Sequence, residues 1–400
     1  MEKKIFVCDV ISSVNEYTGG PALSLIREVI NLNQSGKVDC TIFTFDYKKL
    51  GKLPKIDRDL KIITIPASKI AVGFKGFSHY FEHLLIESTK NNTDLINNHG
   101  LWMFPNFYAR KAAKINKLPL IISTHGMLEE WSLNRSWLKK KIIWNLWEFE
   151  NLKSAVAFKV TSKSEALSIR RLGFKQPIAI IPYCLETTKF LRQDCERKVL
   201  EDDFPKLRNK KWALFMSRID PKKGLMELVE AWKELSSEFA DWHLVIAGPD
   251  LIGYGNKVKF LVKKLSLENS ITFTGMLSGN VKECAFINSE FLVLPTHSEN
   301  FGMVINESLS RSLPVITTKE APWPEIEIYN CGWWIEDNEF ALKDALIKAM
   351  SNSTLELKEM GVRGRKLIED KYNPIYLTQS YIDLLSWVVN GGKPPQFCLE

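Results

Sequence analysis

The chain has 400 residues, which is too long for one ordinary hydrophobic core and fits two domains of typical size. Hydrophobic residues make up 45% of the chain and charged residues 25%, a composition typical of soluble globular proteins. The seven cysteines are scattered and contain no C-x-x-C pair. This arrangement argues against a disulfide framework or a zinc site and favours a reducing compartment.

The formal net charge is +7. Two interpretations are open: a solvated surface with a modest excess of lysine, or a face that docks phosphate groups of substrates or of anionic lipid. Because the chain has no basic low-complexity arm and no recognition motif, we expect no nucleic-acid partner.

The first ten residues place basic side chains before a short apolar run, which Asp9 interrupts. No small-residue cleavage site follows, so we expect a first β-strand here rather than a signal peptide. The sequence contains no stretch of 18 apolar residues, and we therefore expect no membrane span. The predicted location is the cytoplasm.

Short apolar runs alternate with helix-like stretches in the first half of the chain. This alternation is typical of a parallel sheet with helices on both faces. The expected strands are Lys4–Val10, Asp39–Phe45, Leu60–Ile65, Asp94–Asn97, Leu120–Thr124, Ala155–Thr161 and Ile178–Ile181. The expected helices are Pro21–Asn33, Phe77–Lys90, Phe104–Ile115, Leu128–Leu152 and Ser164–Leu172.

The alternation of strands and helices restarts after a polar stretch, residues 186–211. This stretch shows neither the helical nor the strand periodicity of apolar residues, and we interpret it as a link between domains. The expected strands are Trp212–Met216, His243–Ala247, Ile271–Thr274, Phe291–Leu294 and Pro314–Thr317. The expected helices are Leu225–Glu238, Asn256–Leu265, Val304–Ser312, Glu339–Met350 and Leu355–Asp370. An amphipathic helix, Pro374–Val389, follows a break at Asn373-Pro374 and could pack on its own domain or cross back to the first.

One segment, residues 294–317, combines the end of an apolar strand at Pro295 with a polar turn and a helix that opens near Met303. Ligands of open α/β sheets bind at the carboxyl ends of the strands, and a helix N-terminus there suits a phosphate group. Gly302 lets the backbone approach a ligand closely. Glu299 and Glu307 could contact one molecule at different points, a sugar and a ribose diol. The alternative is a helix-capping acid and a surface residue.

A second segment, residues 215–225, ends a strand before a turn and a further helix. Arg218 and Lys223 lie five residues apart across this turn and could converge on one diphosphate, the guanidinium as a fork and the ammonium as a point charge. The alternative is two solvated cations on a loop. Because both segments place phosphate ligands at strand-to-helix turns of one sheet, each supports the other.

With these motifs, at 217–224 and 298–316, the chain resembles the family 4 glycosyltransferases of the bacterial polysaccharide and lipid-linked glycan type. The resemblance covers almost the whole chain and includes Thr18–Pro21, Asn98–Trp102 and Ser123–Met127. It implies an α/β fold of the GT-B type, with two Rossmann-like parallel-sheet domains facing across a cleft. Residues 1–185 would form the acceptor-side domain, joined by a returning C-terminal helix at 374–400. Residues 186–373 would form the domain that binds the nucleotide sugar.

The resemblance also implies a retaining glycosyltransferase whose donor is a nucleotide-diphosphate sugar, with no cofactor and no required metal ion. Front-face attack is expected, with the departing diphosphate helping to take the acceptor proton. Arg218 and Lys223 would hold the diphosphate. Glu307 would bind the ribose hydroxyls and Glu299 the donor sugar. The other donor-binding residues would be Gly19, Gly20, Asn300, Phe301, Gly302, Met303 and Val304.

His125 would face the donor sugar near the reacting centre, although its place after an apolar strand alone is more typical of a structural histidine. His99 and Trp102 are candidates for contact with the acceptor, a glycan or a lipid-linked saccharide. Lys139–Lys141, beside Trp137, predict peripheral contact with anionic lipid on the inner face of the cytoplasmic membrane, and a solvated lysine run is the alternative.

Two positions depart from the family pattern. Asn373-Pro374 stands near the crossover, where an aromatic residue is common, and Asn300 stands where many members carry glycine. Asn300 therefore predicts altered contacts with sugar hydroxyls.

Three other functions remain open. A nucleotide-sugar epimerase or phosphorylase could share the fold. A dehydrogenase would suit paired Rossmann-like sheets, but no G-x-G-x-x-G follows the first strand. A sugar-nucleotide-binding or membrane scaffold protein would bind the donor without turnover.

Overall fold

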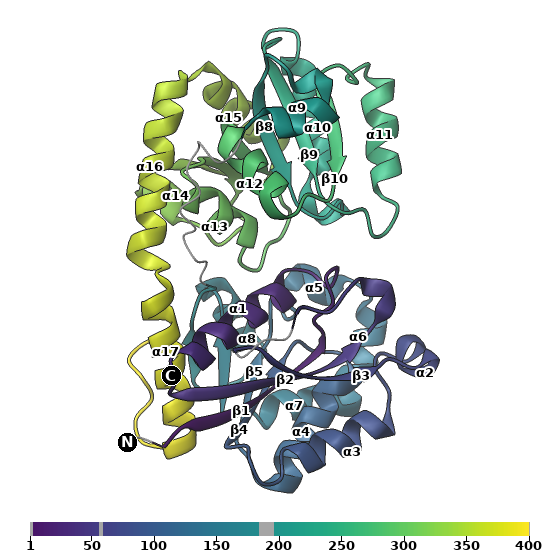
Figure 1. Ribbon diagram of the computed structural model, residues 1–400, viewed down its shortest axis with the longest axis vertical. Helices are drawn as coiled ribbons and strands as arrows, with labels where there is room; N and C mark the ends of the chain where they lie inside the picture. The colour runs from purple at the N-terminus through teal and green to yellow at the C-terminus, as the bar shows by residue number, and fades with distance from the viewer. Residues whose placement is uncertain (1–2, 56–58, 184–195, 400) are drawn as a thin grey trace. The chain divides into compact units, whose positions relative to one another are not determined.

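A computed structural model of the chain describes residues 3–55, 59–183 and 196–399. The chain divides into two compact units (Figure 1): residues 1–184 together with 374–400, and residues 185–373. The first connection between the units falls in 184–195, outside the described residues. Each unit is built on one sheet covered by helices on both faces.

Unit 1 contains a sheet of eight strands in the order β14-β7-β6-β5-β4-β1-β2-β3, parallel except for β14. The strands are β1 (Ile5–Ser13), β2 (Val38–Asp46), β3 (Lys61–Pro66), β4 (Leu95–His99), β5 (Leu120–Ser123), β6 (Ala157–Val160), β7 (Ile178–Ile180) and β14 (Cys398–Leu399). The seven predicted strands of this half are confirmed, and β14 is an addition. The strand order reverses between β1 and β4, so the turns after these two strands lie at the switch point.

The helices of unit 1 cover two hydrophobic cores, one on each face of the sheet. Alternate residues of β1 serve the two faces: Val7 packs with α1 and α17, whereas Cys8 and Val10 pack on the opposite side. The helices are α1 (Gly20–Gln34), α2 (Lys69–Gly73), α3 (His79–Ser88), α4 (Phe104–Asn116), α5 (Glu130–Asn134), α6 (Trp137–Ile143), the π-helix η2 (Trp144–Glu148), α7 (Phe149–Lys153), α8 (Lys163–Arg171) and α17 (Pro374–Asn390).

The predicted single helix Leu128–Leu152 is wrong. Ser136 adopts a left-handed conformation (φ +57°) between α5 and α6, and a π-helical turn separates α6 from α7. A continuous apolar period therefore spans three helices and a π-turn. Left-handed residues and π-turns interrupt a helix without interrupting the periodicity of its apolar side chains.

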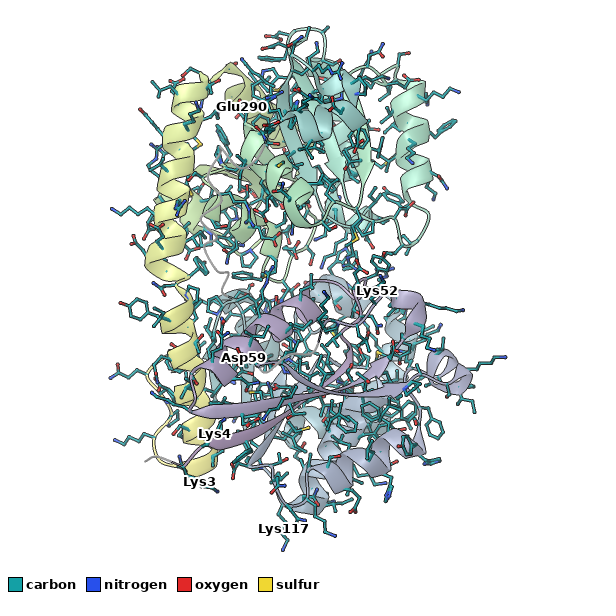
Figure 2. The ribbon with its side chains drawn as sticks, viewed as in Figure 1. Lys3, Lys4, Lys52, Asp59, Lys117 and Glu290 are labelled. Carbon is teal, nitrogen blue, oxygen red and sulfur yellow. The ribbon has the colours of Figure 1, made fainter. Side chains whose placement is uncertain are left out.

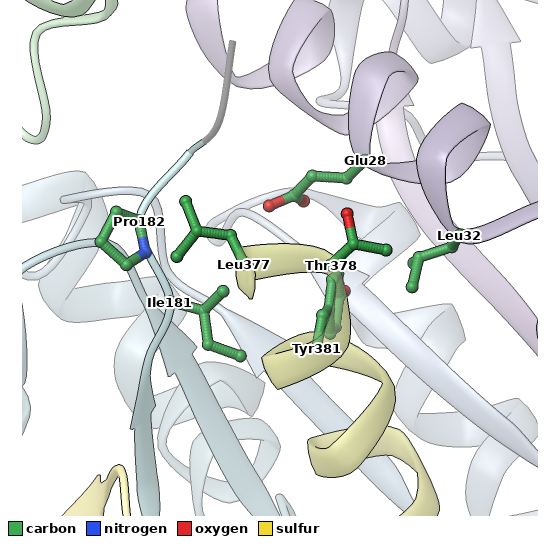
Figure 3. Close-up of a pocket in the computed structure, with 7 residues that line it drawn as sticks. All are labelled: Glu28, Leu32, Ile181, Pro182, Leu377, Thr378 and Tyr381. Carbon is green, nitrogen blue, oxygen red and sulfur yellow. The ribbon is translucent and has the colours of Figure 1, made fainter. Parts of the chain in front are cut away.

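The return of the C-terminal helix to the first unit is confirmed. α17 packs against α1, and Tyr381, Leu384 and Leu385 are buried in the core of unit 1. A small cavity remains between α17, α1 and the segment after β7, and it is lined by Glu28, Leu32, Ile181, Pro182, Leu377, Thr378 and Tyr381 (Figure 3).

Unit 2 contains a parallel sheet of six strands in the order β10-β9-β8-β11-β12-β13. The strands are β8 (Lys211–Met216), β9 (Trp242–Ala247), β10 (Ile271–Gly275), β11 (Phe291–Leu294), β12 (Val315–Thr318) and β13 (Gly332–Ile335). The chain runs outward from β8 to β10 and then returns to β11 beside β8. The switch point of this sheet therefore lies at the carboxyl ends of β8 and β11, where Rossmann-like folds bind ligands.

The helices of unit 2 are α9 (Lys198–Asp203), α10 (Leu225–Leu235), α11 (Gly255–Lys264), α12 (Gly279–Asn288), α13 (Met303–Ser310), α14 (Glu325–Ile328), α15 (Glu339–Ser351) and α16 (Thr354–Lys371). The five predicted helices and five predicted strands of this unit are confirmed, whereas β13, α12 and α14 were not predicted. Residues 186–211, interpreted as a link between domains, contain α9, a short helix that the sequence did not predict, and residues 186–195 lie outside the described residues.

Candidate active site

The turns that follow β8 and β11 are joined to each other. The backbone amide of His297 donates to the carbonyl of Lys222 (2.9 Å), and the Thr296 hydroxyl donates to the same oxygen (3.0 Å). Gly224, the N-cap of α10, has φ +67°, and a Cβ atom there would lie 1.9 Å from the carbonyl oxygen of Pro295. Only glycine allows this approach, and the approach brings the two predicted motifs together.

Lys223 and Glu299 form an ion pair across these two turns, with the lysine side chain 7% and the glutamate side chain 16% exposed. Burial alone would raise the pKa of the Glu299 carboxyl. The charge and hydrogen bond of Lys223, with further attraction from Lys222 and Arg218, instead hold this pKa below its usual range. Arg218 is itself exposed at the end of β8. The structure therefore places the cations predicted to bind the diphosphate and the carboxylate predicted to bind the sugar around one point.

The N-terminus of α13 adjoins this point. Gly302 is its N-cap, in a left-handed conformation with φ +79°, and the first turn carries no acidic residue. Because glycine offers no capping side chain, the first amides of α13, beginning at Met303 and Val304, point out of the helix end as potential anion ligands. Asn300 lies beside them, and its Oδ1 atom is buried without a hydrogen-bond partner among the described residues.

Phe301 anchors the loop before α13. Its ring is buried against Trp323 and Tyr372, and the indole N–H of Trp323 donates to its carbonyl. The Phe301 side chain is therefore part of the core, and its backbone amide is the group that a sugar could reach.

Glu307, one turn into α13, is 8% exposed and is paired with a residue that the sequence did not reveal. The ammonium of Lys282 lies 2.9 Å from Oε1 and 2.8 Å from Oε2 of this carboxylate. Lys282 comes from α12, which had no recognisable helical period. The sequence could not predict this ion pair, because its two residues are 25 positions apart and Lys282 lies on a helix that was not predicted.

In unit 1, His125 follows β5 in a left-handed conformation (φ +51°), which is uncommon for a residue with a side chain. A single buried carboxylate holds both of its chain neighbours: Glu165 Oε1 accepts from the Thr124 hydroxyl and from the Gly126 amide, each at 2.6 Å. Its other oxygen accepts from the amide (2.9 Å) and hydroxyl (3.1 Å) of Thr161. Glu165 thus fixes the turns after β5 and β6 together.

Both nitrogens of the His125 ring are hydrogen-bonded, Nε2 to His99 Nδ1 (3.1 Å) and Nδ1 to the hydroxyl of Tyr183. Burial, with the charges of His99 and Lys159, holds the pKa of His125 well below its usual value, so the ring is neutral. The contact of His125 with a donor sugar stays a prediction.

The two candidate acceptor residues are buried, His99 at 2% exposure and Trp102 at 6%. The Trp102 ring packs near Trp144, and its backbone amide donates to the buried carboxylate of Glu148 (2.8 Å). A buried ring offers little surface on which a sugar could stack, and contact of either residue with an acceptor stays a prediction.

The glycine-rich turn lies where the resemblance places it, after β1. Gly19 (φ +112°) is the N-cap of α1, which begins at Gly20, and within the described chain nothing lies within 4 Å of a Cβ atom added at either glycine. Hydrogen bonds hold this turn in place: the Ser13 and Thr18 hydroxyls are 2.8 Å apart, and the Asn15 amide donates to Asp46 (2.9 Å). Because the space beside the two glycines is open, a ligand could approach the backbone of this turn closely.

Two further observations concern the residues that the structure describes. No group of three or more His, Cys, Asp or Glu side chains is arranged to hold a metal ion. No helix within the described ranges is both long and apolar enough to cross a membrane.

Two family models match the chain: "Glycosyltransferase Family 4" over residues 18–189 and "Glycosyl transferases group 1" over residues 197–367. The chain belongs to glycosyltransferase family 4. The two matches meet at the boundary between the two units, so each unit carries one of the two family domains.

The relatives are distant. The 2-deoxystreptamine N-acetyl-D-glucosaminyltransferase of Niallia circulans is 22% identical over 320 residues, which are 76% of this chain and 78% of that protein. The capsular polysaccharide biosynthesis glycosyltransferase CapM of Staphylococcus aureus is 25% identical over 56% of each chain, which is less than two thirds of its length. Among solved structures, Anabaena HepE in complex with UDP-glucose has a TM-score of 0.76 at 16% identity, over 96% of this chain and 99% of HepE. This chain therefore has the GT-B fold.

The close approach of the two turns can be tested with a pair of glycine variants. Gly224→Ala forces a Cβ atom into the Pro295 carbonyl, so we expect the free energy of unfolding to fall by more than about 3 kcal/mol. Gly253→Ala is the matched control, because Gly253 has a similar φ (+74°) but no described atom within 4 Å of the added Cβ. It should cost about 1–2 kcal/mol. Urea unfolding of the full chain measures both, and equal losses would show that the contact between the turns is not tight.

Proposed function

We propose that this glycosyltransferase moves a sugar from a nucleotide-diphosphate-sugar donor to a hydroxyl of a glycan or lipid-linked acceptor, with retention of anomeric configuration. The arrangement of Arg218, Lys223 and Glu299 around the N-terminus of α13 supports this proposal most directly. Two cations and a helix end favour a diphosphate, and an ionised carboxylate beside them favours a sugar hydroxyl. UDP and UDP-glucose, which are bound in the structures of Anabaena HepE, have both features.

The donor would lie along the carboxyl edge of the unit 2 sheet. The ribose hydroxyls would donate to Glu307, whose carboxylate is held in place by two hydrogen bonds from Lys282. The diphosphate would lie between Arg218, Lys223 and the amides of Met303 and Val304. The donor sugar would then reach Glu299, the amides of Phe301 and Gly302, and the side chain of Asn300. We propose that Gly19, Gly20 and His125 of unit 1 also contribute to donor binding.

The chemistry would be a front-face displacement. The bond between the anomeric carbon and the diphosphate oxygen breaks, and the acceptor oxygen bonds to the same face of that carbon. The acceptor proton passes to the departing diphosphate, whose charge Arg218 and Lys223 stabilise. Catalysis would then rest on position and on electrostatic stabilisation of the leaving group, with no cofactor and no required metal ion. The acceptor class we favour is that of cell-surface polysaccharide synthesis, as for CapM.

We further propose that unit 1 makes peripheral contact with anionic lipid on the inner face of the cytoplasmic membrane. Single lysines such as Lys52 and Lys117 project from this unit at several places (Figure 2), so charge alone does not distinguish one face. One face is distinguished by three exposed apolar side chains that recur every four residues. They are Leu138, Ile142 and Leu146, which are 60%, 61% and 67% exposed. With the exposed lysines Lys139 and Lys141 they form an interfacial pattern: apolar side chains flanked by cations.

Donor binding can be tested by a thermal-shift panel of nucleoside diphosphates and nucleotide sugars on the full chain. A ligand that binds only the folded state raises its stability by mass action, so one nucleotide family should raise Tm. Arg218→Ala should weaken that ligand about ten- to a hundredfold, the worth of a lost hydrogen bond to a charged group. Arg208→Ala is the matched control, because Arg208 is an exposed arginine that precedes the N-terminal end of β8, whereas Arg218 follows its C-terminal end. A shift that survives Arg218→Ala unchanged would contradict the proposed site.

Membrane contact can be tested by co-sedimentation with vesicles of phosphatidylcholine, with and without phosphatidylglycerol. The full chain should sediment with the anionic vesicles only, and more weakly at high salt. Leu138→Ser with Ile142→Ser should release it, whereas Phe340→Ser, at a residue of unit 2 that is 82% exposed, should not. Equal recovery of all three proteins in the supernatant would leave the lysine run as a solvated surface.

A further inference from the structure

A chain of hydrogen bonds runs through unit 1 from Asp9 to Tyr183. His99 Nε2 lies 2.9 Å from Asp9 Oδ1, His99 Nδ1 lies 3.1 Å from His125 Nε2, and His125 Nδ1 contacts the Tyr183 hydroxyl. Three of the four residues are at most 3% exposed. The three rings lie nearly parallel, at 18° between the two imidazoles and 19° between His125 and Tyr183. The geometry therefore links a buried carboxylate to the turn after β5.

The carboxylate sets the direction of this chain, because its oxygens only accept hydrogen bonds. Nε2 of His99 must then carry the hydrogen that points at Asp9. At a pH where His99 holds a single hydrogen, its other nitrogen, Nδ1, has a lone pair, so it accepts the hydrogen of His125 Nε2. Nδ1 of His125 is left with a lone pair that accepts from Tyr183. Burial raises the pKa of Tyr183 well above its usual value and so keeps the hydroxyl protonated.

Asn97 supports this direction. Its amide nitrogen lies 2.7 Å from Asp9 Oδ1, 2.6 Å from the Tyr381 hydroxyl and 2.8 Å from His99 Nε2. An amide has two hydrogens, and the oxygens of Asp9 and Tyr381 accept them. The reverse assignment would aim the lone pair of His99 Nε2 at the Asp9 oxygen 2.9 Å away, which is repulsive.

We propose that Asp9 and His99 are positioning residues that hold the imidazole of His125 in one orientation and one tautomer, with its hydrogen on Nε2. The orientation and tautomer of His125 do not depend on the proposed function, and only their consequence for the reaction rests on it. With both nitrogens engaged and the backbone fixed by Glu165, His125 is a rigid, uncharged part of the site. It cannot act as the base for the acceptor hydroxyl, and that proton is left to the diphosphate.

The returning helix contributes to the same network. Tyr381 of α17 bonds to Asn97, and the ammonium of Lys159 lies 4.6 Å from the Tyr381 ring and 5.4 Å from the Tyr183 ring. Lys159 is paired in turn with Glu28 of α1 at 2.6 Å, and both side chains are buried. Figure 3 shows Glu28 and Tyr381 beside the small cavity between α1 and α17. A buried charge pair and two aromatic rings thus pack against the hydrogen-bonded chain.

The tautomer can be read directly by nitrogen NMR of the full chain labelled with ¹⁵N-histidine, at about pH 8 so that unperturbed imidazoles are neutral. The signals of His125 are those absent from His125→Gln. In the wild type we expect His125 and His99 each to carry hydrogen on Nε2 and a bare Nδ1. In Asp9→Ala the amide of Asn97 loses this acceptor and can donate to His99 Nε2, 2.8 Å away, so the chain should reverse and His125 should carry its hydrogen on Nδ1.

Two further variants make the outcome decisive. Tyr381→Phe removes a neighbouring hydrogen bond but keeps Asp9, so it should leave the tautomer unchanged. Tyr183→Phe should also leave it unchanged, and this variant tests the proposal even if Asp9→Ala does not fold. Hydrogen on Nδ1 in the wild type, an unchanged tautomer in folded Asp9→Ala, or a reversal in Tyr183→Phe would each overturn the proposal. None of these signals depends on turnover, so they separate this proposal from the proposed function.

Discussion

The ion pair between Lys223 and Glu299 is the interaction on which the site of unit 2 depends. Burying either charge alone would cost several kcal/mol, so the two turns that carry them must stay together. Gly224 makes this possible, because its missing side chain lets the turn after β8 approach Pro295 after β11. The pair also has a chemical consequence: Glu299 is held ionised, while Arg218 beside it remains exposed to solvent and free to meet an anion.

The two units solve the problem of buried polarity differently. In unit 2 the side chains of the site are charged and paired, Lys223 with Glu299 and Lys282 with Glu307. In unit 1 the histidine that the resemblance singles out is neutral, and its ring is held by hydrogen bonds to His99 and Tyr183, which the buried carboxylates of Asp9 and Glu165 support through neighbouring residues. A charged site suits the binding of a diphosphate, whereas a neutral and rigid side chain suits contact with a sugar, which is uncharged. Both arrangements are fixed before a ligand arrives, which lowers the cost of ordering the site on binding.

The sheets could largely be predicted from the sequence, because buried parallel strands such as Leu120–Ser123 and Phe291–Leu294 are short apolar runs between polar turns. The strand Gly332–Ile335 was missed because it is only half-buried and starts at a glycine, and α12 because its apolar residues cluster at one end. The three helices within 130–153 could not be separated, since the left-handed Ser136 leaves no mark on the apolar period.

The proximity of the two local motifs could be predicted, because Arg218, Lys223 and Glu299 lie in the turns that follow two strands of one sheet. The partners of other site residues could not. Glu165 has the spacing of a helix-capping residue after Ser162, yet its carboxylate binds a turn 39 to 41 residues away. Asp9 did leave a signal, a charge in an otherwise apolar strand, but its partner His99 lies 90 residues further along the chain. Such pairs exist only once the sheet has brought distant strands side by side.

The most direct test of the central claim is transfer itself. The full chain would be incubated with a panel of radiolabelled nucleotide sugars and a mixture of lipid-linked saccharides, and label in the saccharide fraction would be measured for the wild type and Arg218→Ala. We expect one nucleotide sugar to label an acceptor, and the variant to lower the rate about 10²- to 10³-fold, as for the loss of one charge-stabilising donor. Conversion of a nucleotide sugar without labelled acceptor would contradict glycosyl transfer, and an unchanged rate in Arg218→Ala would contradict a diphosphate site built on this residue.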